Sequence, residues 1–190
     1  MNHGDPTQKK YLVLWSGGLR STWTLYFLLS QTGAAIHAHH VNLMSRGPDG
    51  LISRNHDTEK AATRAMQSWL ADHVRRFPYS ESFVDLTAFE PRARDEVVCL
   101  YLGAQAAMSW GFLPSDSLML GNGEDISAPG ERTALVENRR RFRALTYRRV
   151  VEAVLQSERV PEVSWIMPTP SRAQQIADLP DQLLDQLAGR

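Results

Sequence analysis

Short apolar runs alternate along the chain with longer segments in which apolar residues recur at every third or fourth position. The short runs predict β-strands at residues 11–15, 35–43, 82–86, 117–120 and 163–167. The periodic segments predict helices at residues 20–30, from the candidate N-cap Asp57 to about residue 74, and at 94–110, 135–157 and 171–187. A polar loop with Gly and Pro at residues 44–55 separates the second strand from the second helix.

Strands that alternate with helices of ten residues or more are typical of parallel βαβ units. The sequence therefore predicts an α/β fold, a doubly wound parallel sheet with helices on both faces. A chain of 190 residues is close to the usual size of one core, so we expect a single domain over residues 1–190, with a polar leader at residues 1–10. Ligands of such sheets bind beyond the carboxyl ends of the strands, where the strand order reverses.

Composition removes several classes of protein. Lys and Arg together number 21, as do Asp and Glu, so no overall charge favours nucleic acid, a membrane or an acidic substrate. Cys99 is the only cysteine, which excludes an intramolecular disulfide and a zinc site built from several cysteines. The first ten residues lack the apolar core of a signal peptide, and no apolar run reaches the roughly 20 residues that span a bilayer. We expect a cytoplasmic protein without a membrane partner.

Two adjacent glycines stand where the first strand gives way to the first helix, in the stretch SGGLRST at residues 16–22. A helix N-terminus presents unpaired amide groups and a partial positive charge, and glycine lets a phosphate come close to them. Hydroxyl groups of Ser16, Ser21 and Thr22 can add donors. The alternative is a tight turn between strand and helix, since neither the Walker lysine nor GxGxxG is present.

This strand, loop and helix resemble the SGGxDS pyrophosphate loop of the PP-loop ATP pyrophosphatases, and most of all the 7-cyano-7-deazaguanine synthase group. Further stretches resemble the family in the same order along residues 11–172. They are Arg54-Asn55-His56 with Glu59, the stretch GNGED at residues 121–125, and Glu137-Asn138-Arg139. The resemblance implies an adenine nucleotide alpha hydrolase-like sheet of five strands in the order 3-2-1-4-5. The stretch SGGLRST at residues 16–22, which we call the glycine corner, and GNGED would then flank one crevice at the reversal.

The resemblance also implies an activity. Such enzymes split ATP into AMP and pyrophosphate while they activate a small carboxylate as its adenylate, for amide or nitrile formation. The nearest precedent for the substrate is a carboxylate of the 7-deazaguanine type. The implied catalytic residues are Arg20, His56, Asp125 and Arg139. The implied nucleotide ligands are Ser16, Gly17, Gly18, Leu19, Ser21, Thr22, Val41, Gly121 and Asn122. Glu124 and Asp125 would hold Mg²⁺, because hard cations prefer carboxylate oxygens; ATP and Mg²⁺ are the expected cofactors, and zinc is not expected.

Two departures from the family keep other functions open. Arg20 stands where the family has aspartate, an exchange that favours phosphate binding and impairs catalysis. The family's C-terminal zinc module needs four cysteines and cannot form from Cys99 alone. The first alternative is therefore a nucleotide-binding subunit or sensor that lacks turnover and works with a partner protein or as a homodimer. The second is a tRNA-directed modifier, because residues 139–149 contain six arginines and no acid. The competing interpretation of this cluster is a solvated helix face, which makes nucleic acid the less favoured partner.

Several polar residues have a structural interpretation beside the functional one. Alternation along a strand puts His37 and His39 on one face and His40 on the other, so at most two could share a metal, and a structural role is favoured. His56 is a candidate general acid or base, or else an exposed loop histidine.

The remaining candidates are treated in the same way. Glu124 and Asp125 are either metal ligands or a solvated turn, and Asn122 either contacts a base or holds the loop. Arg172 resembles a family lysine at the start of the last helix. Tryptophans within apolar stripes are expected in the core, namely Trp23, Trp69 and Trp110.

Overall fold

The computed structural model describes most of the chain. The described residues are 9–44, 56–88, 95–121, 142, 145–149, 152–153, 160–164, 166 and 170–188, with the side chains of residues 56–59 and 95–96 left out. The predicted loop at residues 44–55 lies almost entirely outside them. Most of the predicted helix at 135–157 lies outside them as well, although residues 142, 145–149 and 152–153 are helical.

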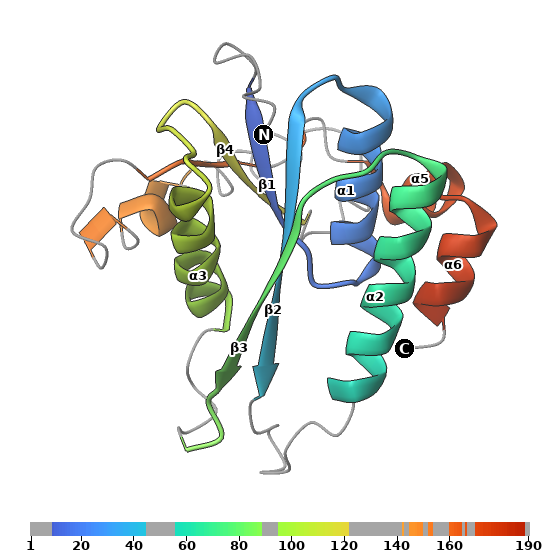
Figure 1. Ribbon diagram of the computed structural model, residues 1–190, viewed down its shortest axis with the longest axis horizontal. Helices are drawn as coiled ribbons and strands as arrows, with labels where there is room; N and C mark the ends of the chain where they lie inside the picture. Colours follow the sequence, from blue (N-terminus) through green and yellow to red (C-terminus); the bar gives the residue numbers. More distant parts are fainter. Residues whose placement is uncertain are drawn as a thin grey trace.

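Five parallel strands form one sheet in the order β3-β2-β1-β4-β5 (Figure 1). The strands are β1 (Lys10–Leu14), β2 (Ala35–Met44), β3 (Tyr79–Asp85), β4 (Ser117–Leu120) and β5 (Glu162–Ser164). The predicted α/β class, the parallel sheet and the order 3-2-1-4-5 are confirmed. The strand order reverses between β1 and β4, so the crevice of this fold lies at the carboxyl ends of these two strands.

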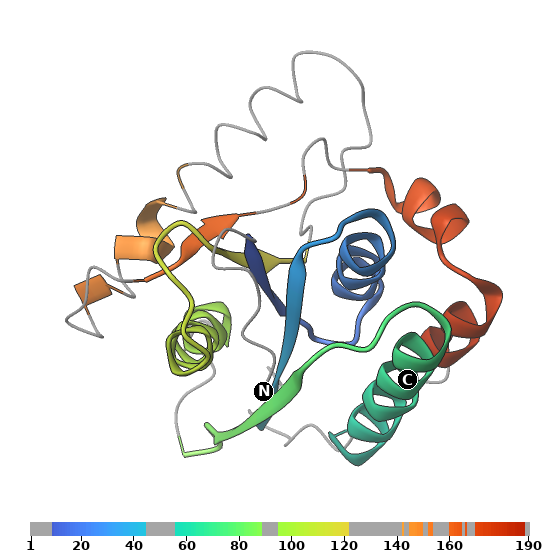
Figure 2. The same cartoon turned by 45° about the horizontal axis from the view of Figure 1, so that its top comes forward.

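Helices cover both faces of the sheet (Figure 2). They are α1 (Leu19–Gln31), α2 (His56–His73), α3 (Asp95–Ser109), α5 (Arg172–Asp178) and α6 (Asp181–Ala188). The α3 helix lies on one face, while α1, α2 and the two C-terminal helices lie on the other. Helix α2 begins one residue before the predicted N-cap Asp57, and β3 begins three residues before the predicted start at Ser82.

The predicted single helix at residues 171–187 is wrong. Two short helices stand in its place, joined at Leu179 and Pro180. Proline has no amide proton and disfavours helical backbone in the residue before it. Leu179 is accordingly extended, with ψ 138°. The start of the first helix is as expected for a serine cap, because the side chain of Ser171 accepts a hydrogen bond from the amide of Gln174.

The sheet separates two hydrophobic clusters. Leu12 and Leu118 are partners in the β1–β4 register and belong to the cluster under α3, whereas Val13 and Met119 belong to the cluster under α1 and α2. Leu12 and Val13 are both fully buried, which confirms that β1 is covered on both faces. Glycine lets α3 lie close to β1, since a Cβ at Gly103 would come within 2.6 Å of a methyl group of Leu14.

The tryptophans divide between core and surface. Trp23 is buried and stacks on Phe27 with ring centroids 5.1 Å apart, and Trp69 is half-buried against the same cluster. Trp110 is 46% exposed, so its predicted place in the core is wrong. It directly follows the last residue of α3 and therefore leaves the apolar stripe of that helix.

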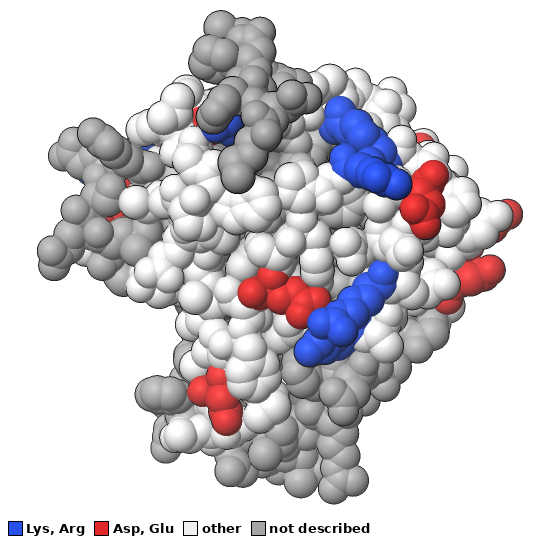
Figure 3. Space-filling model, in the orientation of Figure 1, with Lys and Arg blue, Asp and Glu red and all other residues white. Residues whose placement is uncertain are grey.

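Charged side chains form separate groups on the face seen in Figure 3, where basic groups lie next to acidic ones. One such contact links α2 to the edge strand, because Arg64 Nε lies 3.4 Å from Glu81 Oε1. Glu81 in turn accepts a hydrogen bond of 2.8 Å from the hydroxyl of Tyr79. Neighbouring charges of opposite sign agree with the zero net charge of the sequence.

Replacement of Leu118 by Ala should lower the free energy of unfolding by about 2–5 kcal/mol, because it opens a cavity among fully buried side chains. Leu113→Ala is the matched control, since Leu113 is 55% exposed, and should change stability by at most about 0.5 kcal/mol. Urea unfolding of both variants measures the difference. Equal losses in the two variants would contradict the assignment of the core.

Candidate functional site

A pocket of about 550 Å³ opens at the carboxyl edge of the sheet. We call it the crevice pocket. Its walls come from the glycine corner, from the ends of β1, β2 and β4, and from α3 and α5. Among the predicted site residues, those that line it are Ser16, Gly18, Leu19, Arg20, Ser21, Val41 and Gly121. Arg172 lines it as well, so residues far apart in the sequence meet at the reversal point.

The N-terminus of α1 faces this pocket without a carboxylate of its own. Gly17 has φ 74°, a left-handed conformation that favours glycine. Gly18 is the N-cap, and within the described part of the chain no side chain caps it. The first turn of α1 contains no acidic residue. The partial positive charge of the helix end is therefore not neutralised by an acid of that turn, which suits an anionic ligand.

Two serines hold the shape of the glycine corner. Ser21 Oγ accepts from the amide of Ser16 at 3.2 Å and donates to the carbonyl of Gly18 at 3.1 Å. The hydroxyls of Ser16 and Ser21 are 3.0 Å apart, and the amide of Gly18 donates to Ser16 Oγ at 3.3 Å. These hydroxyls thus form part of the loop's own hydrogen-bond network at the pocket wall.

Thr22 and Gly17 do not line the crevice pocket. Thr22 is fully buried. Its Oγ1 accepts a hydrogen bond of 2.9 Å from the indole of Trp15 and lies 4.0 Å from the sulfur of Met66. The Thr22 hydroxyl therefore bonds within the core behind the glycine corner, whereas the sequence predicted that it donates to a phosphate.

Trp15 ties the corner to the neighbouring strand. Its amide donates to the carbonyl of His39 at 3.0 Å, and its carbonyl accepts from His40 Nδ1 at 2.7 Å. The indole bonds Thr22 at the start of α1. Sequence reasoning did not select Trp15 as a site residue; its place directly before the double glycine was the available signal.

The end of β4 touches the first turn of α1. A Cβ added to Gly121 would lie 3.0 Å from the amide nitrogen of Ser21 and 3.1 Å from its Cα. Such contacts are tighter than most side chains accept, so glycine allows the two backbones to meet. Sequence reasoning placed Gly121 in the crevice by resemblance, and this close approach is a physical reason for glycine there.

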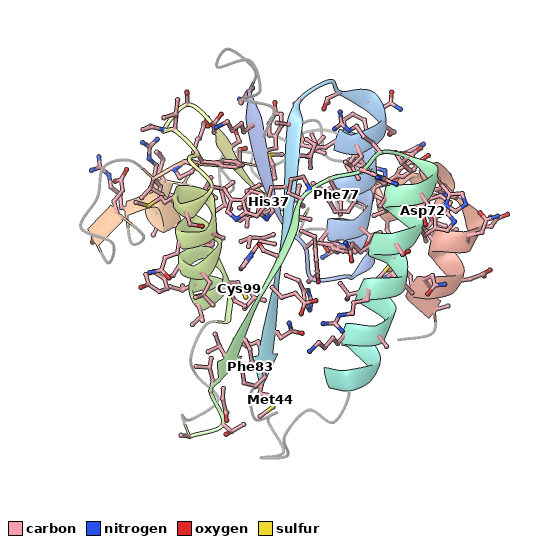
Figure 4. The ribbon with its side chains drawn as sticks, viewed as in Figure 1. His37, Met44, Asp72, Phe77, Phe83 and Cys99 are labelled. Carbon is pink, nitrogen blue, oxygen red and sulfur yellow. The ribbon has the colours of Figure 1, made fainter. Side chains whose placement is uncertain are left out.

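His39 and Cys99 also line the crevice pocket, although neither was among the predicted ligands. Figure 4 labels Cys99 on the side of α3 that faces the sheet. His39 lies on the α3 face of β2, in register with Leu14, which also lines the pocket. The wall opposite the glycine corner therefore combines apolar side chains with an imidazole and a thiol.

A chain of hydrogen bonds joins two histidines of β2 through β3. Ser80 Oγ lies 2.9 Å from His37 Nε2 and 2.7 Å from His39 Nδ1, and Ser82 Oγ lies 3.1 Å from His39 Nε2. One hydroxyl proton cannot serve both rings, so the tautomers of the two histidines are linked through Ser80. These bonds fit the structural interpretation. Among the described residues, no group of three potential metal ligands was found.

Several predicted site residues lie outside the described part of the chain. These are Asn122, Glu124, Asp125 and Arg139. His56 is the first residue of α2, but its side chain is not described. The magnesium ligands and the acid or base candidates therefore stay predictions. Of the arginine cluster, Arg148 and Arg149 are described. Arg149 is exposed, and Arg148 Nε lies 2.8 Å from Glu152 Oε1.

No family model, curated protein or solved structure matches this chain. The fold class and the geometry of the crevice pocket therefore come from the structure of this chain alone. Within the described helices, none has both the length and the apolar character needed to cross a membrane.

Gly121→Ala should displace the first turn of α1, because the new methyl group would meet the backbone of Ser21. We expect a loss of about 1–3 kcal/mol in the free energy of unfolding. Gly33→Ala is the matched control, since a Cβ there meets no atom within 4 Å, and should stay within about 1 kcal/mol of wild type. Thermal unfolding compares them; a harmless Gly121→Ala would refute the close approach.

Stability should depend on pH through the two bonded histidines. Burial, and to a smaller extent the charge of a neighbouring histidine, lowers the pKa of His37 and of His39 from 6.5 to about 4. An unfolded chain binds protons at these sites below pH 6.5, whereas the fold does not until about pH 4. Stability is therefore full above pH 6.5 and falls as the pH drops towards 4, by on the order of a few kcal/mol at about 1.4 kcal/mol per pKa unit.

Urea unfolding across this pH range measures the effect. The double variant His37→Gln, His39→Gln should show a shallower pH dependence than wild type, because the two buried imidazoles no longer take up protons on unfolding. An identical slope in the two proteins would show that these histidines do not carry the difference.

Proposed function

We propose that the chain binds ATP in the crevice pocket and is an adenylating enzyme of the PP-loop type. One observation carries the proposal. At the reversal of the strand order, the acid-free N-terminus of α1 lines a single pocket together with the end of β4. The resemblance of SGGLRST to a pyrophosphate loop supports the finer assignment.

The character of the pocket walls supports a nucleotide. The triphosphate would lie at the amides of the glycine corner. Arg20 and Arg172 are also lining residues of the pocket, and guanidinium pairs well with phosphate. Adenine and ribose would lie across the strand ends, where Leu14, Val41 and Leu120 supply apolar surface. A pocket of about 550 Å³ is within the usual range for small-molecule sites.

In the proposed reaction, a carboxylate oxygen of the acceptor attacks the α-phosphorus of ATP. The bond from that phosphorus to the bridging oxygen breaks, and pyrophosphate leaves towards the glycine corner. Ammonia then attacks the acyl carbon of the adenylate, AMP leaves, and the nitrogen loses a proton. The chain would contribute positioning and charge stabilisation. Mg²⁺, predicted at Glu124 and Asp125, would supply further neutralisation of the phosphates.

Arg20 supports a second candidate function. It lines the crevice pocket at the position where the resembled family has aspartate. A cation there strengthens phosphate binding, while it removes a carboxylate from the reacting groups. The second candidate is thus a nucleotide-binding subunit or sensor without turnover.

Calorimetry with Mg²⁺ and ATP tests the proposed site. Wild type should bind, and Gly17→Ala should weaken binding by about tenfold or more, because alanine strains a left-handed corner and shifts the amides. Gly111→Ala is the matched control, because Gly111 has a similar φ of 71° but follows α3 and is not part of the glycine corner. Absence of ATP binding at millimolar concentration would refute the proposal.

A pyrophosphate-release assay with candidate carboxylates, among them a 7-deazaguanine carboxylate, separates the two functions. The enzyme proposal expects release by wild type and a lower rate in Arg20→Asp. Binding without turnover in wild type, with turnover gained in Arg20→Asp, would favour the sensor and contradict the enzyme.

A further inference from the structure

A second pocket of about 310 Å³ lies at the amino edge of the sheet, opposite the crevice pocket. We call it the amino-edge pocket. Its polar and aromatic lining comes from β1, from β2, from the connection after α2 and from the residues after α3. The side chains that matter here are Lys10, His37, Arg75, Arg76, Phe77 and Trp110. Figure 4 labels two of them, His37 on β2 and Phe77 on the connection into β3.

The lining of this pocket is cationic. Lys10, Arg75 and Arg76 contribute to it, and no Asp or Glu is among its described lining residues. Figure 3 shows basic side chains on this side of the molecule, beyond the end of α2. Asp72, labelled in Figure 4 on α2, is exposed and does not line the pocket. The local charge therefore favours an anion over a neutral ligand.

Two buried polar atoms of the lining have no hydrogen-bond partner. They are His37 Nδ1 and Arg75 Nη2, and the other two such side-chain atoms in the described residues belong to Asn42 and Gln175, outside the pocket. His37 is 3% exposed, and its Nε2 is held by Ser80. Arg75 Nη1 donates to the carbonyl of Thr32 at 3.0 Å, which fixes the guanidinium. Buried polar groups without hydrogen-bond partners are costly, so the presence of two such atoms in the lining of one pocket points to a ligand.

An aromatic surface adjoins these atoms. The ring of Trp110 meets the imidazole of His37 edge to face, with centroids 3.7 Å apart and planes at 72°, and it remains 46% exposed. Phe77 and Phe112 add apolar surface to the same pocket. A large aromatic side chain that stays exposed beside a cationic pocket offers a planar ligand a surface for contact.

We propose that the amino-edge pocket binds a small aromatic anion, with its charged group on Arg75 and its ring against Trp110. The volume lies at the lower end of small-molecule sites, which suits a single ring with one carboxylate or phosphate. Arg75 Nη2 supplies a charge-assisted hydrogen bond. His37 Nδ1 supplies a second donor in the tautomer whose Nε2 accepts from Ser80. This site is separate from the nucleotide site and does not depend on the proposed function.

Titration of the full chain with benzoate, phenyl phosphate and neutral benzamide tests the site by NMR. The indole N–H of Trp110, assigned from the spectrum of Trp110→Leu, reports binding. We expect saturable shifts with at least one of the two anions, at a Kd on the order of 1 mM, and binding of benzamide at least about tenfold weaker.

Arg75→Gln should weaken the binding of the anion by about tenfold, because it removes a charged donor. Arg64→Gln is the matched control, because Arg64 lies on α2 and does not line the pocket. This variant should bind the anion as wild type does. If Arg75→Gln fails to fold, Trp110→Leu decides the question, with the backbone amides as reporters. Binding that is unchanged in Trp110→Leu, or absent for both anions at roughly tenfold the expected Kd, would overturn the proposal.

Discussion

The hydrogen bond from the indole of Trp15 to the hydroxyl of Thr22 holds the corner on which the crevice depends. Both groups are buried, so loss of either would leave a polar group without a partner in the core. The backbone of Trp15 also bonds β2 through His39 and His40. The first strand, the second strand and the first helix are thereby fixed relative to one another, with the first residues of α1 lining the pocket.

Two close approaches at glycines complete this arrangement. Gly121 lets the end of β4 touch the first turn of α1, and Gly103 lets α3 approach β1. The carboxyl edge then carries the crevice pocket and the amino edge carries the cationic pocket. Hydrogen bonds run between them, because His39 lines the first pocket, His37 lines the second, and Ser80 contacts both rings.

Sequence reasoning predicted the fold well, since apolar runs and helical stripes are local signals and parallel βαβ units restrict the topology. It also found much of the crevice wall, because glycines and hydroxyls at a strand end are local too. It failed where tertiary packing decides: Thr22 bonds an indole, and Trp110 leaves the stripe of its helix. The break of the C-terminal helix before Pro180 could have been predicted from the proline itself. The amino-edge pocket combines residues of β1 and β2 with residues after α2 and after α3, a combination that no pattern within one element contains.

The most direct test of the account is to locate ATP on the protein. In an NMR titration of the isotope-labelled chain with Mg²⁺ and ATP, the amide signals of Gly18, Leu19 and Ser21 should shift most, together with that of Gly121 at the facing strand end. This result would put the phosphates at the start of α1. Saturable binding with its largest shifts elsewhere in the chain, and these four amides unmoved, would contradict the account.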